Sequence, residues 1–394
     1  MSILHSRFDQ RLYFNICSKK NLRNAIRHNR KKGQRTPGVD NVTMKDWINS
    51  GIRSKTKELY LAMDGLDAYE VGEVRETFIT KDNGKKRRIA VLNLVDNVVS
   101  RACYQVLSEV FDSRFNHSNF GYRPRRNRGQ AAVHCQQLIN SGATYWVKAD
   151  IKDCFGNIKR KRLKGLLSVL FKDKHQKLLE MLKQFVDMEK RPLGIVQGGC
   201  LSPFFSNVYL DEVDTKLAQE GFLFAHYGDD YVIGCRSEED AWRALETLDK
   251  HLKEVDLSIN DDKSNIVEIE NDKLNFCGFS ITKDNIEVSE QSAKRMLRKS
   301  KRLIDDFCQS DAIKLDEIEY FEPNYEQDSK NPDYRKRERK RRAIHRNFDS
   351  VIAEHGGILP RWLSYVQNWA MQHEIANPKQ VNGLVDLVFK YRAA

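Results

Sequence analysis

The chain has 394 residues and a mass of 45.9 kDa, with 67 Lys and Arg against 55 Asp and Glu, which gives a formal net charge of +12. Hydrophobic residues make up 40% and charged residues 31%, a composition that excludes collagen-like, low-complexity and wholly disordered chains. No apolar run approaches the roughly 18 residues that a membrane span needs, and the opening MSILHSRFDQ lacks the apolar core of a secretion signal, so we expect a cytoplasmic protein without a membrane partner.

The first predicted element is a basic helix near the N-terminus. A cluster of cations occupies this stretch: Lys19, Lys20, Arg23, Arg27, Arg30, Lys31, Lys32 and Arg35. A helix from Asn15 to His28 would place Lys20, Arg23 and Arg27 on one side. Together with a pI of about 9.2, this stripe favours nucleic acid as a partner, bound through its phosphates. A solvated helix face is the alternative.

A β-hairpin with a basic tip is predicted next. The β-forming residues 77–80 and the apolar residues 89–92 flank the turn Asp82-Asn83-Gly84. Apolar residues recur at three- and four-residue spacing over 95–110, which predicts a helix. The single cysteines lie among apolar neighbours and are expected to be free, buried thiols.

The rest of the chain alternates short strands with helices. Strands are predicted over 145–151, 223–227, 231–235, 265–269 and 276–281, and helices over 160–188, 206–218 and 241–255. Beyond these we expect a basic helix over 291–307, an acidic loop or insert over 308–333, the basic run RKRERKRR at 335–342, and a final helical region with Trp362, Tyr365 and Trp369 as core residues.

Three carboxylates lie at the ends of predicted strands. Asp150 ends an apolar strand, and Asp229 and Asp230 lie in a tight turn between two others. By itself, the adjacent pair is equally typical of a solvated turn. Carboxylates from neighbouring strands would repel each other at one sheet edge unless a divalent cation such as Mg²⁺ intervenes. Because two such ions stabilise both oxygens of an in-line phosphoryl transfer, the pattern predicts a nucleotidyl transferase.

Eight segments in a fixed order resemble a known family. They are TPGVD (36–40), KDNGKKRRIAVL (81–92), NFGYRPRRNRGQAA (119–132), WVKADIKDCFGNI (146–158), GIVQGGCLSPFFSNVYLDEVD (194–214), YGDD (227–230), LSINDDKSNI (257–266) and NFCGFSIT (275–282). With these motifs the chain resembles the prokaryotic reverse transcriptases of the group II intron-like branch, among them retron and defence-associated enzymes.

The resemblance implies an α+β right-hand polymerase fold, with fingers, a palm built on a short antiparallel sheet, and a helical thumb. It divides the chain into a basic N-terminal extension over 1–60, fingers over 61–143, a catalytic palm over 144–285 and a thumb-like helical region over 286–394 that contains the acidic insert 308–333. RNA template, DNA primer or product, and dNTPs are the partners that it implies.

The resemblance also implies a role for each site residue. Asp150, Asp229, Asp230 and Lys263 would be catalytic, with Lys263 protonating the pyrophosphate that leaves. Two Mg²⁺ ions, or Mn²⁺, would bind Asp150, the Ile151 carbonyl, Asp229 and Asp230. The incoming dNTP would contact Lys81, Arg87, Phe155, Gln197 and Gly198, with the Phe155 ring excluding a ribose 2′-OH.

Several alternatives stay open for these roles. Lys85, Lys86 or Arg88 could replace Lys81 and Arg87 as the cations that bind triphosphate. Phe155 could be an ordinary core residue and Lys263 an exposed helix-end lysine. The GDD turn also occurs in RNA-dependent RNA polymerases, although Phe155 and the QGxxxSP pattern argue against that class.

We infer the biological role from domains that we expect to be missing. No endonuclease-like or zinc-ribbon segment follows the thumb-like region. We therefore favour a stand-alone enzyme that copies a dedicated structured non-coding RNA, in an antiviral defence role. The alternatives are a group II intron-type maturase or RNA-binding scaffold, and an enzyme of template-independent or protein-primed DNA synthesis.

Overall fold

The computed structural model describes residues 12–32, 36–64, 69–80, 84, 86–171 and 175–295. Several predictions lie outside these residues: those for Lys81, the insert 308–333, the basic run 335–342, the final helical region, and most of the helix over 291–307. No helix in the described part of the chain is long and apolar enough to cross a membrane. Contacts divide the chain into two compact units, one of Met1–Arg126 with Tyr145–Ile266 and one of Asn127–Thr144 with Val267–Ala394.

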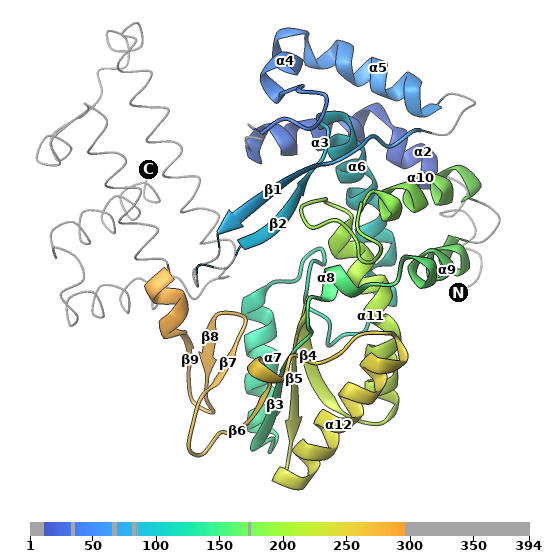
Figure 1. Ribbon diagram of the computed structural model, residues 1–394. Helices are drawn as coiled ribbons and strands as arrows, with labels where there is room; N and C mark the ends of the chain where they lie inside the picture. Colours follow the sequence, from blue (N-terminus) through green and yellow to red (C-terminus); the bar gives the residue numbers. More distant parts are fainter. Residues whose placement is uncertain are drawn as a thin grey trace, which may run out of the picture. The chain divides into compact units, whose positions relative to one another are not determined.

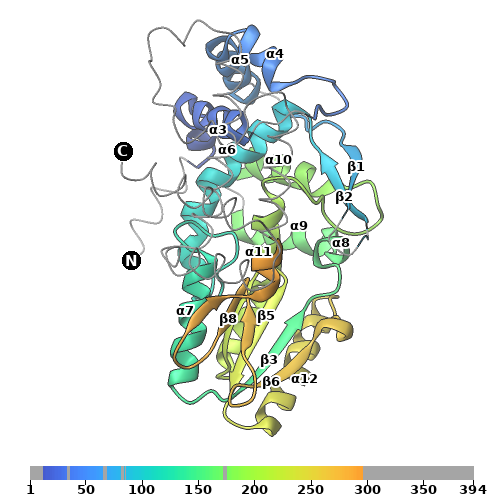
Figure 2. The same ribbon diagram turned by 90° about the vertical axis from the view of Figure 1, so that its left-hand side faces the viewer.

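In the first unit, the N-terminal helices pack around α6 (Leu94–Phe111), as Figure 2 shows. Both α2 (Leu12–Cys17) and α3 (Lys19–Lys32) contact α6, and α5 (Ile52–Asp64), which follows α4 (Met44–Asn49), packs on α3. The helix predicted over 95–110 is confirmed, and Val98, Val99 and Leu107 on its inner face are fully buried. Each contributes about 1.5–3 kcal/mol to folding.

The helix predicted from Asn15 to His28 is instead two helices that meet at Ser18. The Ser18 hydroxyl accepts a hydrogen bond from the Asn21 backbone N–H at 3.3 Å, which caps the start of α3. It also donates to the Asn15 carbonyl at 2.9 Å. The spacing of apolar residues continues across Ser18, although the helix does not. The prediction of one continuous helix was therefore wrong, whereas the cations of α3 are exposed as expected.

A two-stranded hairpin follows, formed by β1 (Arg75–Thr80) and β2 (Lys86–Val91). The strands are antiparallel, with Arg75 opposite Val91 and Thr80 opposite Lys86. The predicted hairpin is therefore confirmed. Figure 1 shows the two strands as adjacent arrows.

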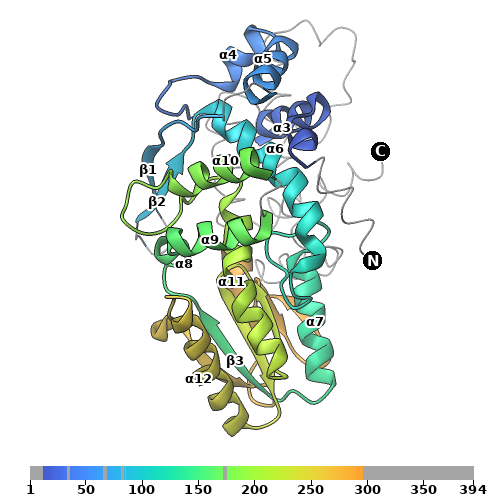
Figure 3. The ribbon, with the colours of Figure 1, turned by 90° about the vertical axis from the view of Figure 1, so that its right-hand side faces the viewer.

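A four-stranded sheet lies at the centre of the first unit, in the order β4 (Leu223–Tyr227), β5 (Asp230–Cys235), β3 (Tyr145–Asp150) and β6 (Asn265–Glu268). Helix α12 (Glu238–Glu254) packs on β3 and β5, and α11 (Ser202–Gln219) packs on α12 and on α9 (Arg160–Phe171). Figure 3 shows α11 and α12 side by side. The short α8 (Cys154–Asn157) and α10 (Gln176–Asp187) complete the unit.

Two predicted helix boundaries differ from the structure. The stretch 160–188 is two helices, α9 and α10, rather than one. Helix α11 begins at Ser202, four residues before the predicted start, with a proline in its first turn. Proline suits that position because its φ is already helical and the N–H it lacks would have no partner there.

The second unit pairs α7 (Arg128–Asn140) with a three-stranded sheet of β7 (Leu274–Phe276), β8 (Phe279–Ile281) and β9 (Ile286–Val288). The single strand predicted over 276–281 is a hairpin, because Cys277 and Gly278 adopt φ values of 54° and 88°. Two successive left-handed residues form a type I′ turn, which reverses the chain. The protein as a whole has the expected mixed α+β fold.

Candidate active site

Three carboxylates lie together at one end of the central strands of the four-stranded sheet. Asp150 and Asp230 are direct partners in the antiparallel register of β3 and β5, so their side chains lie on the same face. Tyr227 pairs with Asp230, which leaves Gly228 and Asp229 as a two-residue turn between β4 and β5. A φ of 71° at Gly228, with no left-handed φ at Asp229, is typical of a type II′ turn.

Backbone hydrogen bonds fix this turn against the end of β3. The Ile151 N–H donates to the Asp229 carbonyl at 3.0 Å. On the other side, the Asn260 N–H donates to the Asp150 carbonyl at 2.7 Å and the Lys152 N–H to the Ser258 carbonyl at 2.9 Å. The three carboxylates are thus set by main-chain geometry rather than by flexible side chains alone.

Two of the three carboxylates, Asp229 and Asp230, have raised pKa values. Desolvation by the surrounding atoms, followed by the charges of Asp229 and Asp150, raises the pKa of Asp230 to about 6, although water still reaches part of its surface. Burial, followed by the charge of Asp150, raises the pKa of Asp229. The site therefore concentrates more negative charge than its own cations neutralise.

Lys263, in the 3₁₀ turn Asp261–Lys263, supplies part of the missing positive charge. Its Nζ lies 2.8 Å from Asp150 Oδ2, and Asn260 Nδ2 donates to the same oxygen at 3.1 Å. Among the described residues, no three His, Cys, Asp or Glu side chains already form a metal site. The donor set nevertheless fits Mg²⁺, because hard carboxylate oxygens that repel one another are what this ion binds.

Close backbone packing holds the turn on its other side. A Cβ on Gly121 would lie 2.4 Å from the Gly228 nitrogen and 3.1 Å from the Tyr227 carbonyl carbon. A Cβ on Gly228 would lie 3.1 Å from Cε2 of Tyr122, whose ring also packs on Tyr227 at 5.7 Å between centroids. Glycine at 228 therefore fits the crowding by Tyr122 as well as the left-handed φ.

The β1–β2 hairpin carries the candidate triphosphate-binding cations, and it places Arg87 and Arg88 in different surroundings. Arg87 is exposed on β2, and its positive charge lowers the pKa of Asp229, opposing the upward shift. Arg88, in contrast, binds Glu76 and lies 2.8 Å from the fully buried Glu189 carboxylate. Arg88 is thus committed to a structural role, which removes it as an alternative to Arg87. Lys81 and Lys85 lie outside the described residues.

Of the other predicted dNTP contacts, Phe155 lies on α8, and Gln197 and Gly198 lie on the loop before α11. The Phe155 carbonyl accepts a hydrogen bond from the Ile195 N–H at 2.8 Å, and the half-buried Phe155 ring packs on the core. The Gln197 carbonyl accepts one from the Ala90 N–H at 2.7 Å, which ties this loop to β2. Gly198 has a φ of 121°, and a Cβ there would lie 2.6 Å from the Ala90 carbonyl oxygen.

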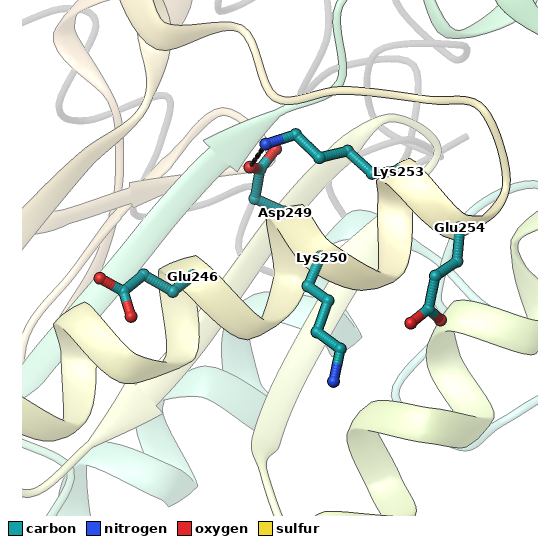
Figure 4. Close-up of a pocket in the computed structure, with 5 residues that line it drawn as sticks. All are labelled: Glu246, Asp249, Lys250, Lys253 and Glu254. Atoms are coloured by element: carbon teal, nitrogen blue, oxygen red, sulfur yellow. Dashed lines mark ion pairs between the residues drawn. The ribbon is translucent and has the colours of Figure 1, made fainter.

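A pocket on α12 is a different kind of feature. It is lined by Glu246, Asp249, Lys250, Lys253 and Glu254, all from one helix. Figure 4 shows Lys253 reaching back to Asp249, and their charged atoms are 2.5 Å apart. Because its carboxylates and ammonium groups are interspersed, this surface has neither the unbalanced charge nor the converging strands of the Asp150 site.

Sequence reasoning missed several residues that shape the site. Asn260 binds Asp150 twice, and Gly121 contacts the turn directly, although both lie within segments that resemble the family. His226 was missed as well; it lies on β4 next to the turn. Of these, only Asn260 carried a usable signal, since Asn followed by Asp261 and Asp262 is a cluster of turn-forming residues next to Lys263.

Comparison with known proteins agrees with this geometry. A family model described as Reverse transcriptase (RNA-dependent DNA polymerase) matches residues 79–281, just over half of the chain. That range contains Asp150, Asp229, Asp230 and Lys263. Among solved structures, apo telomerase from Candida tropicalis, truncated from its C-terminal domain, has a TM-score of 0.45 and 16% identity, covering 57% of this chain and 56% of that chain.

Two curated proteins show how far the similarity extends in sequence. The group II intron-encoded protein LtrA of Lactococcus lactis subsp. cremoris is 29% identical over 198 residues, which cover 48% of this chain and 32% of that protein. Protein YkfC of Escherichia coli (strain K12) is 29% identical over 210 residues, which cover 47% of this chain and 51% of that protein. The chain therefore spans about a third of one relative and about half of the other.

Proposed function

This chain belongs to the reverse transcriptase family, and we propose that it adds deoxynucleoside monophosphates to the 3′-OH of a primer paired with an RNA template. The observation that carries this proposal is the direct pairing of Asp150 with Asp230 beside the Asp229 turn. Such a cluster suits the positive charge that phosphoryl transfer requires. Members of the family generally use divalent metal ions.

We assign the metal ligands to Asp150, the Ile151 carbonyl, Asp229 and Asp230. Two bound Mg²⁺ ions would stabilise the attacking and leaving oxygens. The protein's own groups supply the rest: Arg87 and Lys81 neutralise the triphosphate, and Gln197 and Gly198 line the template base pair. Lys263, paired with Asp150 in this structure, would turn to the departing pyrophosphate and protonate it.

The direct test of this function is primer extension. The purified protein, with Mg²⁺ and dTTP, is expected to extend oligo(dT) on poly(rA), and the product should resist RNase and yield to DNase. RNA binding without extension, over a range of Mg²⁺ and Mn²⁺ concentrations, would instead support the RNA-binding scaffold. DNA that stays in the phenol phase until protease treatment would support protein priming.

Phe155→Val is expected to weaken discrimination against ribonucleotides by about 10–100-fold, because a smaller side chain leaves room for a 2′-OH. The measurement is the ratio of kcat/KM for dTTP to that for UTP on poly(rA)/oligo(dT). Phe171→Val, at a buried phenylalanine of α9, is the matched control and should change stability without changing that ratio. Equal ratios in wild-type and Phe155→Val would assign Phe155 to the core alone.

We further propose that the template is a dedicated structured non-coding RNA and that the enzyme acts in antiviral defence. Support for an RNA-binding surface comes from α3, whose exposed residues include Lys20, Arg23, Arg27 and Arg30. The helix contains no acidic residue. Its stripe of cations therefore attracts phosphates more strongly than a solvated helix face of mixed charge would.

Replacing Lys20, Arg23 and Arg27 with glutamine is expected to weaken binding of structured RNA by about 10–100-fold near 0.1 M salt. The plot of log affinity against log salt should become shallower by about two to three units. The control replaces Arg243, Lys250 and Lys253 on α12, which removes the same net charge from a surface rich in carboxylates. Equal affinity of both variants would show that total charge, rather than the α3 stripe, governs binding.

A second candidate is a group II intron-type maturase, favoured by the similarity to LtrA, which is a group II intron-encoded protein. To distinguish the defence enzyme from the maturase, the protein is expressed together with the DNA that flanks its gene and purified. The RNA that is bound to it is then sequenced. One small RNA with complementary DNA, and loss of phage resistance in an Asp229→Asn strain, would support the defence enzyme. A bound intron that splices faster with the protein would support the maturase.

A further inference from the structure

Behind the catalytic turn lies a fully buried polar network. His226 on β4 contacts Asp214 of α11, with 2.8 Å between Nε2 and Oδ2. The other oxygen of Asp214 accepts a hydrogen bond from the Tyr231 hydroxyl at 2.7 Å. The His226 and Tyr231 rings stack with 4.5 Å between centroids and only 5° between planes. The His226 and Asp214 side chains are both completely buried, so the network is isolated from water.

The second ring nitrogen of His226 connects this network to the turn. Nδ1 lies 3.3 Å from the carbonyl oxygen of Gly228. A carbonyl can only accept, so Nδ1 must carry a hydrogen for this contact to be a hydrogen bond. On the other side of the ring, Nε2 contacts Asp214 Oδ2 at 2.8 Å. Asp214 therefore fixes the ring orientation that aims Nδ1–H at Gly228.

The carbonyl of Gly228 belongs to the peptide bond that carries Asp229. This peptide lies in the middle of a two-residue turn, outside the β4–β5 register. Type I′ and type II′ turns differ mainly by a flip of this central peptide. A donor placed against the Gly228 carbonyl stabilises one of the two orientations, and with it the position of the Asp229 carboxylate.

We propose that His226 is a positioning residue that holds the Gly228–Asp229 peptide in its active orientation, with Asp214 and Tyr231 holding the ring. The inference deepens the proposed function and rests on it for its kinetic test. His226 itself does not contact the reacting atoms. Its effect is expected in kcat, because a carboxylate held in the wrong place slows the chemical step without removing the dNTP contacts.

Two amide substitutions separate the two hydrogen bonds of the ring. In His226→Asn, the amide nitrogen occupies the place of Nδ1 and keeps a donor for Gly228, while Oδ2 of Asp214 loses its partner and Oδ1 keeps the Tyr231 hydroxyl. In His226→Gln, the amide nitrogen occupies the place of Nε2 and keeps the bond to Asp214, while Gly228 loses its donor. Positioning thus predicts higher activity in the asparagine variant, and burial of a carboxylate oxygen that has lost its partner predicts lower stability there.

The expected result is an inverse order of activity and stability. On poly(rA)/oligo(dT), kcat of His226→Gln should fall at least about tenfold, and that of His226→Asn no more than about threefold, with KM for dTTP unchanged in both. The melting temperature should be lower for His226→Asn. Should that variant not fold, the double variant His226→Asn, Asp214→Asn removes the unpaired charge and should regain both folding and activity.

His251 on α12 provides a matched control. It is also buried, with Nε2 2.7 Å from Glu220 and Nδ1 3.3 Å from Glu254. His251→Asn and His251→Gln should change stability and leave kcat unchanged. If kcat of the His226 variants simply follows their melting temperatures, as for His251, the network is structural and the proposal is wrong.

A spectroscopic measurement separates this inference from the proposed function. In ¹⁵N-histidine-labelled protein, the His226 signal is identified by its loss in His226→Asn. A protonated Nδ1 is expected at neutral pH, whether or not the protein polymerises DNA. An unprotonated Nδ1 would overturn the inference and leave the polymerase assignment untouched, whereas absent polymerisation with a protonated Nδ1 would count against the function alone.

Discussion

Asp229→Asn is expected to lower kcat for DNA synthesis by at least about 10³-fold, equivalent to about 4 kcal/mol of transition-state stabilisation. The substitution keeps the shape of the side chain and removes one of three neighbouring negative charges. Affinity for the RNA–DNA template–primer should change by less than about twofold, because phosphate-binding cations supply that energy. Single-turnover extension of oligo(dT) on poly(rA) measures the chemical step directly.

The same substitution is expected to leave the melting temperature unchanged or raise it. Asp229 is crowded by Asp150 and Asp230, and burial and repulsion raise its pKa, so its charge opposes folding. The matched control is Asp249→Asn on α12, which removes a half-buried carboxylate that is paired with Lys253. Full activity in Asp229→Asn would remove the three-carboxylate site from the mechanism.

Gly121→Ala is expected to lower kcat by about 100-fold although residue 121 carries no chemistry. The new methyl group would lie 2.4 Å from the Gly228 nitrogen, and the atoms it meets are all backbone. Gly121 cannot retreat easily, because its N–H donates to Asn119 at 3.0 Å and its carbonyl accepts from Asn207 at 2.9 Å. The turn must therefore shift, and displacement of about 1 Å typically costs about that factor.

Gly165→Ala tests whether the effect is specific to that contact. Gly165 lies in α9, and a Cβ there would meet no atom within 4 Å. Alanine should raise the free energy of unfolding by about 0.5–1 kcal/mol, because glycine is the poorer helix former, and kcat should not change. Equal kcat in Gly121→Ala and wild-type would mean that the turn tolerates displacement, contrary to its packing.

Sequence patterns predicted the elements that local physics determines. The strand from Tyr145 and the helix over 95–110 are strongly apolar at the right spacing, and both are confirmed. The predictions failed where one or two residues interrupt the spacing of apolar residues that indicates a helix or a strand. Ser18 ends one helix by capping the next, and Cys277 with Gly278 turns a predicted strand into a hairpin. Cysteine is not a common turn residue, so its presence at position 277 does not predict a left-handed φ there.

The carboxylates were found because Asp150 ends one apolar strand, and Asp229 and Asp230 lie at the turn between two others. Their contacts were not, because these depend on register and on packing across long sequence separations. The ion pair between Lys263 and Asp150 joins residues 113 positions apart, and Arg88 lost its candidacy only once Glu189 was seen beside it. No periodicity specifies such partners. Motif order identifies a polymerase site, whereas three-dimensional geometry decides which cations are available to it.

The meeting of Gly121 with the Tyr227–Gly228 peptide has a consequence for recombination between related genes. Two chain segments about a hundred residues apart touch through main-chain atoms, so neither can be exchanged without matching the other. A chimaera with a crossover anywhere between residues 123 and 223 would inherit the two halves from different parents. Transferring residues 118–122 together with 223–235 preserves the contact between Gly121 and the turn, so the two segments must come from the same parent.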